Sequence, residues 1–78
     1  MSTILVVENL MREAFHGARA LRSEEYRMGA RATLECFVEH RPAHCPFTFG
    51  TAEADAFFSG EDEGRDIWLR ALASGVAA

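Results

Sequence analysis

The sequence predicts an all-α fold, a small three-helix domain with an extended Cys-Pro linker before the last helix. Apolar residues recur at steps of three and four in three segments, which is the spacing of a helix face. Ser23 and Thr51 stand where a hydroxyl would cap the second and third segments. Pro42 and Pro46 lie between those two segments and disfavour helix there. We expect helices over residues 4–21, 24–40 and 52–73.

The first expected helix, 4–21, carries a single apolar stripe. The β-branched residues Ile4, Val6 and Val7 favour a strand, but no partner strand follows, so we prefer a helix. The stripe consists of Ile4, Val7, Leu10, Met11, Ala14, Phe15, Ala18 and Leu21.

The second expected helix begins after Ser23, with Glu24 and Glu25 in the first turn, where the helix dipole favours acids. Pro42 disfavours helix at the preceding residue, so we expect the helix to end near His40. Its outer face carries Arg27, Arg31, Glu35 and Glu39, and the spacing allows Arg31 to pair with Glu35.

The third expected helix places Gly60 and Gly64 on its buried stripe if it runs through without a break. Glycine there permits close approach of another backbone, at a cost of about 1 kcal/mol each relative to Ala. If the helix breaks, it breaks at Gly60. The spacing Tyr26-x-x-Gly29 in the second helix is echoed by Phe57-x-x-Gly60 in the third, which indicates shared helix-packing chemistry.

A chain of 78 residues has room for one small core, so a homodimer or another partner would add materially to its stability. The core residues that we expect are Leu10, Ala14, Phe15, Leu21, Tyr26, Leu34, Phe37, Phe47, Phe57, Trp68 and Leu72.

The net charge of −4 comes from the C-terminal third, where residues 51–78 hold six acids and two Arg. Such a balance argues against direct nucleic-acid binding by the last helix, because surfaces that follow phosphates are basic. The longest apolar run, residues 4–7, is too short to span a bilayer and lacks the flanks of a signal peptide. We expect a cytoplasmic protein with reduced cysteines.

One group of residues is a weak zinc candidate, since two thiols and two imidazoles suit tetrahedral zinc. The alternative is two buried free thiols and two surface imidazoles, because the spacing is not that of a standard finger. A thiol nucleophile at Cys45 lacks the electropositive setting that it needs. We therefore expect no enzyme and no cofactor. The four candidate ligands are Cys36, His40, His44 and Cys45.

The acidic run of the last helix is either a solvated face or a patch that meets a basic partner. Phe57 and Phe58 point about 100° apart on a helix, so one of them can be exposed and mark a partner surface. The partner-binding candidates on this helix are Phe58, Glu61, Asp62, Glu63 and Asp66.

Three motifs occur in order: Tyr26-x-x-Gly29-x-x-Ala32, Cys45-Pro46-Phe47, and the aromatic-x-x-Gly motif Phe57-x-x-Gly60 within the last expected helix. Together they resemble the ribosome modulation factor (RMF)/CrpP-like family of small proteins over about residues 26–68. The resemblance implies a helix–linker–helix unit within residues 23–73, while residues 1–22 lie outside it. It also implies that the matching residues are structural, namely Gly29, Cys45, Pro46, Phe47, Phe57, Gly60 and Trp68.

Ribosome modulation factor is basic and binds ribosomal RNA of the small subunit, whereas this chain is acidic over the matching helix and contains no Lys. The CrpP-like branch is linked to ATP-dependent drug modification, but no glycine loop with a Lys is present to hold a phosphate. We therefore expect a non-enzymatic binding or regulatory protein that acts through a protein or ribonucleoprotein partner. In a ribosome binder the contact face would include Arg19, Arg27 and Arg31.

Two alternatives remain open: an acidic inhibitor, of bacterial or phage origin, that occupies a basic nucleic-acid-binding groove of another protein, and a small zinc-binding domain.

Overall fold

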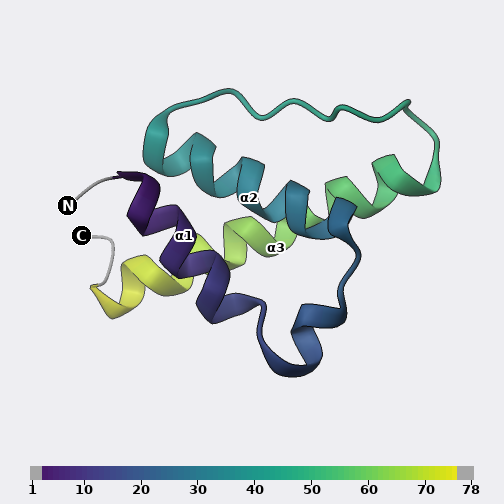
Figure 1. Cartoon of the computed structure of the whole chain (residues 1–78). Coiled ribbons are helices and arrows are strands. Elements are labelled where there is room, and N and C mark those ends of the chain that lie inside the picture. The colour runs from purple at the N-terminus through teal and green to yellow at the C-terminus, as the bar shows by residue number, and fades with distance from the viewer. Residues whose placement is uncertain (1–2, 76–78) are drawn as a thin grey trace.

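The computed structural model describes residues 3–75, apart from the side chains of Thr3, Ile4 and Arg19. Its three α-helices confirm the all-α prediction, and residues 3–75 contain no strand (Figure 1). Within the same range, no helix has both the length and the apolar character that a membrane span needs. The elements are α1 (Thr3–Ala14), a short 3₁₀ helix η1 (Gly17–Leu21), α2 (Glu24–Glu39) and α3 (Ala52–Ser74).

The predicted first helix was too long, because α1 ends at Ala14 instead of continuing to residue 21. Gly17 has a φ of +59°, a left-handed conformation that interrupts a right-handed helix. The chain then forms the 3₁₀ turn η1, and Leu21 at its end is 87% exposed. The apolar stripe predicted for residues 4–21 is therefore not one surface.

The predicted boundaries of the other two helices agree with the structure to within one residue. The Ser23 side chain accepts a hydrogen bond from the backbone N–H of Tyr26 at 3.2 Å, and Thr51 accepts one from Ala54 at the same distance. His40 ends α2 in a left-handed conformation. The predicted hydroxyl caps at Ser23 and Thr51 are thus confirmed.

Helices α2 and α3 run in the same direction, as Figure 1 shows by the colour along each ribbon. Residues that face each other across the pair differ by 31 in number: Gly29 lies against the turn around Gly60, Thr33 lies against Gly64, and the ring of Phe37 stacks on Trp68. The two glycine-containing motifs that echo each other in the sequence therefore meet at the same level of one parallel helix pair.

The closest approach is between the two backbones at Gly29 and Gly60. A Cβ atom built on Gly60 would overlap the carbonyl oxygen of Tyr26, and one built on Gly29 would overlap that of Phe57. Gly64 extends this contact, since its Cβ would lie 2.7 Å from the Ala30 carbonyl oxygen. The prediction of a continuous third helix with glycines that admit a second backbone is confirmed.

The parallel arrangement explains the extended linker, residues 40–51. Because both helices start at the same end, the chain must return along the full length of α2, which is about 24 Å for its 16 residues. About eight extended residues cover that distance. The linker runs along α2 in Figure 1, and the ring of Phe47 holds its far end against Phe57, with 6.2 Å between ring centroids.

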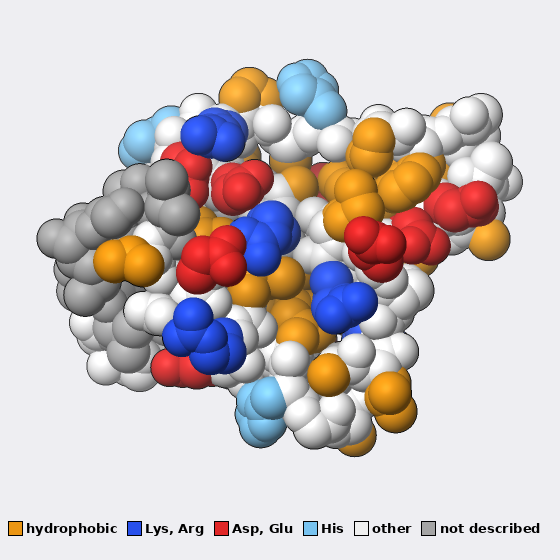
Figure 2. Space-filling model, in the orientation of Figure 1, with side chains coloured by type: hydrophobic (Ala, Val, Ile, Leu, Met, Phe, Trp, Pro, Cys, Tyr) orange, Lys and Arg blue, Asp and Glu red, His pale blue; other side chains and the backbone are white. Residues whose placement is uncertain are grey.

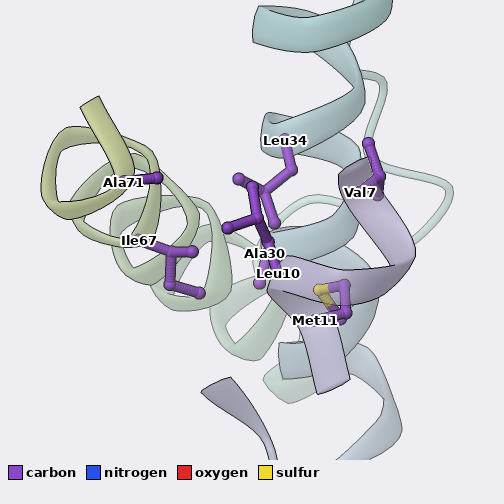
Figure 3. Packing of buried hydrophobic residues seen from close by; sticks show 7 residues of the cluster. All are labelled: Val7, Leu10, Met11, Ala30, Leu34, Ile67 and Ala71. Carbon is purple, nitrogen blue, oxygen red and sulfur yellow. The ribbon is translucent and has the colours of Figure 1, made fainter. Parts of the chain in front are cut away.

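Helix α1 lies across the α2–α3 pair and closes the core. Figure 3 shows the side chains of α1 meeting those of α2 and α3 in this cluster, which consists of Val7, Leu10, Met11, Ala30, Leu34, Ile67 and Ala71.

The expected core was right in part. Leu10, Leu34 and Phe57 are buried. Ala14, Phe15, Tyr26, Phe47 and Trp68 are half-buried. Leu21, Phe37 and Leu72 are exposed, so placing them in the core was wrong. Small residues on α2 and α3 bring the two helices so close together that large side chains at the edges of the contact remain outside it.

Candidate functional site

The predicted partner-binding residues lie on two separate surfaces of the molecule. Asp62, Asp66 and Phe58 are exposed on the side of α3 that faces away from α2. Arg27 and Arg31 line a groove between α1 and α2. The side chain of Arg19 lies outside the described residues.

The first surface, which we call the outer face of α3, combines apolar and acidic groups. Phe58 is 38% exposed and Leu69 is 55% exposed, although both are large apolar residues. Arg65 is the one cation of this face among residues 3–75 and pairs with Asp62 at 3.3 Å. The face also carries three aspartates, so its net charge is negative. Steps of three and four residues place these exposed side chains on one side of the helix. The face consists of Asp55, Phe58, Asp62, Arg65, Asp66 and Leu69.

The exposed ring of Phe49 extends this face beyond the helix. It is 87% exposed and lies 6.3 Å from the ring of Phe58, between centroids. Phe49 was not singled out as a partner residue in the sequence. The linker folds back onto α3, and that contact depends on tertiary structure.

Glu63 belongs to neither surface, although the acidic run suggested it for partner binding. Its carboxylate accepts hydrogen bonds from the Tyr26 hydroxyl at 3.3 Å and from Arg70 at 3.4 Å, and its side chain is only 11% exposed. Glu63 thus joins α2 to α3. Of the three consecutive acids, Asp62 alone points fully to solvent, because successive residues on a helix diverge by about 100°.

Glu61 lies beside the Gly29–Gly60 contact and is half-buried. Burial, and to a smaller extent the neighbouring Asp62 carboxylate, raise the pKa of Glu61 above its ordinary value of 4.5. A carboxyl whose pKa is higher in the folded state than in the unfolded state destabilises the fold when it is ionised. This effect is present at neutral pH and disappears as the pH falls below the ordinary value.

We therefore expect Glu61→Gln to stabilise the protein at pH 7 by a few tenths of a kcal/mol, a small effect because solvent screens the carboxylate. At about pH 3.5 the variant and the parent should have equal stability, because Glu61 is then protonated in both states. Thermal unfolding at the two pH values measures the difference. Glu13→Gln on α1 is the matched control, and an equal gain from it would contradict the assignment to Glu61.

The second surface is a groove of about 410 Å³ between α1 and α2. In Figure 2, basic side chains surround a hollow with hydrophobic groups at its bottom, on the face where α1 and α2 lie in front. Arg31 forms an ion pair with Glu8 across the two helices, where the sequence suggested pairing with Glu35. This hydrogen bond and the charge of Arg31 lower the pKa of Glu8. The lining residues are Glu8, Met11, Arg12, Phe15, Glu24, Arg27, Met28 and Arg31.

The weak zinc candidates are not gathered into one site. Cys36 is half-buried on α2, His40 is the exposed residue that ends it, and His44 is exposed on the linker. The thiol of Cys45 lies 3.7 Å from the Phe47 carbonyl oxygen, which it can reach as a weak donor. Among residues 3–75, no three His, Cys, Asp or Glu side chains come together as metal ligands. Both cysteines are free thiols.

Five of the seven residues that the family resemblance marks as structural lie in or beside the contact of α3 with α2 and the linker, whereas Cys45 and Pro46 belong to the linker itself and Pro46 is exposed. Gly29 and Gly60 form the closest approach, Phe57 is 2% exposed beneath Phe47, and Trp68 stacks on Phe37. No family model matches the chain, and no curated protein or solved structure is significantly similar to it. The function must therefore be inferred from the two surfaces and from the resemblance of residues 26–68.

Proposed function

We propose that this chain is a small non-enzymatic binding protein of the ribosome-modulation-factor-like type. It acts by placing the outer face of α3 on a basic surface of a protein or ribonucleoprotein partner. The observation that carries the proposal is the exposure of Phe58 and Leu69, two large apolar residues surrounded by aspartates. A chain this small gains little stability from its core, so apolar residues that it leaves exposed indicate a contact surface. Apolar anchors with acidic neighbours match a basic partner with an apolar depression.

The resemblance to the ribosome modulation factor family supports a binding role in a second way. The matching residues pack α2 against α3 and so form a rigid support for a binding surface. The acidic residues Asp62 and Asp66 of the matching helix are exposed. A family-like packing motif between the helices, combined with an acidic exposed surface, fits a protein that keeps the family's helix packing but binds a different partner.

The test is affinity purification of the tagged full chain from its host at low salt, with Leu69→Ala and the parent compared. We expect Leu69→Ala to weaken capture of the partner about tenfold, because truncation of a buried interface anchor costs about 1–2 kcal/mol. Leu5→Ala on α1 is the matched control, since Leu5 is 53% exposed and Leu69 is 55% exposed. Equal capture by the two variants would rule out the outer face as the docking surface.

A second candidate, the acidic inhibitor, is favoured by the three aspartates of the same face. It predicts one basic, nucleic-acid-handling protein in the purified material, without RNA. Small-subunit ribosomal proteins together with ribosomal RNA would instead support the ribosomal role. In the inhibitor, Asp62→Arg combined with Asp66→Arg should abolish capture, and raised salt should weaken it strongly. Capture that is insensitive to both changes would exclude the inhibitor.

A further inference from the structure

We propose that the groove between α1 and α2 binds a small oxyanion, namely a phosphate or carboxylate group on a short apolar body, with Arg27 and Arg12 as its charged contacts. This site is separate from the outer face of α3, and the inference does not rest on the proposed function.

The positive charges of the groove lack enough acceptors. Three guanidinium groups line it, and Arg31 has the Glu8 carboxylate as its partner. Arg12 donates to a neutral acceptor, the side-chain oxygen of Asn9, at 3.0 Å. Arg27 is half-buried, and within residues 3–75 its Nε–H is shielded from solvent and has no hydrogen-bond partner. A charged group is costly when a buried donor of it is left unpaired. Arg27 also lines the groove, so an acceptor from outside the chain can reach its guanidinium group there.

A guanidinium presents its donors in a planar fork that matches the oxygens of a phosphate or carboxylate. Arg27 comes from α2 and Arg12 from α1, and both line the same hollow of about 410 Å³. Small-molecule sites in proteins have volumes of this order. An oxyanion held between the two arginines would therefore join the two helices.

The remaining lining residues indicate the size and character of the ligand. Glu8 and Glu24 also line the groove, and their carboxylates would repel the further charges of an extended polyanion. A single charged group fits between them. Met11, Phe15 and Met28 give the groove apolar walls, which favour a ligand whose remaining part is apolar.

The experiment is a titration of the isotope-labelled full chain, followed by the Nε–H signals of its arginines in NMR spectra. The probes are inorganic phosphate, phenyl phosphate and phenylacetate. We expect saturable shifts at Arg27 and Arg12, and at least tenfold tighter binding of a phenyl-bearing probe than of inorganic phosphate. The tighter of the two phenyl-bearing probes identifies phosphate or carboxylate as the preferred group.

Two variants test the assignment of the contacts. Arg27→Gln and Arg12→Gln should each weaken binding of the better probe at least tenfold, and Arg12 is exposed, so its variant retains the fold. Arg65→Gln, on the outer face of α3, is the control and should bind like the parent. Absence of saturable shifts at Arg27, or equal weakening by Arg65→Gln, would overturn the proposal. Equal binding of inorganic phosphate and phenyl phosphate would overturn its apolar part.

Discussion

Gly60→Val is expected to unfold the domain under conditions in which the parent chain is folded. A side chain at residue 60 would overlap the carbonyl oxygen of Tyr26, and its Cβ would lie 2.8 Å from that carbonyl carbon and 3.1 Å from the backbone nitrogen of Ala30. These atoms belong to a helix backbone and cannot rotate away, so the two helices must separate. We expect a loss of more than about 4 kcal/mol, at the upper end of what single substitutions cause.

Urea unfolding followed by circular dichroism measures this loss. Gly60→Ala should cause a smaller loss of stability, because the better helix propensity of Ala offsets about 1 kcal/mol of the cost of the overlap. Ser59→Val is the matched control, because it introduces the same side chain one residue earlier at an exposed site. The control should lose under about 1 kcal/mol, from helix propensity alone. Similar losses in both Val variants would show that the close contact of α2 and α3 does not hold the fold.

Phe57→Ala is expected to have the second largest effect, a loss of about 3–5 kcal/mol in the free energy of unfolding. Phe57 is 2% exposed and packs edge-on against Phe47 and Phe58, with 6.2 and 6.1 Å between ring centroids. Its removal leaves a cavity beneath the linker as well as a gap in the core. The linker should therefore become accessible to proteases in addition to the loss of global stability.

Phe49→Ala is the matched control, since it removes the same side chain from a position that is 87% exposed. Its stability should stay within about 0.5 kcal/mol of the parent. Limited proteolysis at Arg41 with trypsin separates the two roles of Phe57. If Phe57→Ala were no more easily cleaved or unfolded than Phe49→Ala, the Phe47–Phe57 contact would not anchor the linker.

Local chemistry was sufficient to predict much of the helical framework. Ser23 and Thr51 cap helices through hydrogen bonds within three residues, so their role depends on neighbours in the sequence alone. The sequence left a break at Gly60 open, but it did predict that Gly60 and Gly64 would lie on the buried stripe of an unbroken third helix, because glycines at steps of four on an apolar stripe fit a close helix contact.

Tertiary contacts decided what the sequence could not predict. The groove exists because α1 crosses α2, so that Arg12 and Arg27 line one hollow, and no helix pattern predicts that combination. Glu63 resembled its acidic neighbours in the sequence, yet Tyr26 and Arg70 bind it inside the molecule. The end of α1 depended on the backbone conformation of Gly17, a residue that helices also tolerate.

The parallel pairing of α2 and α3 has a consequence for how the chain reaches its folded state. Antiparallel neighbouring helices can start their contact at a short turn and extend it residue by residue. Here, facing residues are equally far apart in the sequence at both ends of the α2–α3 contact, as the pairs Gly29 with Gly60 and Phe37 with Trp68 show. The entropy of closing that loop must be lost before any packing is gained. Folding of this all-helical protein is therefore governed by a non-local encounter, with the slower rates that such topologies have.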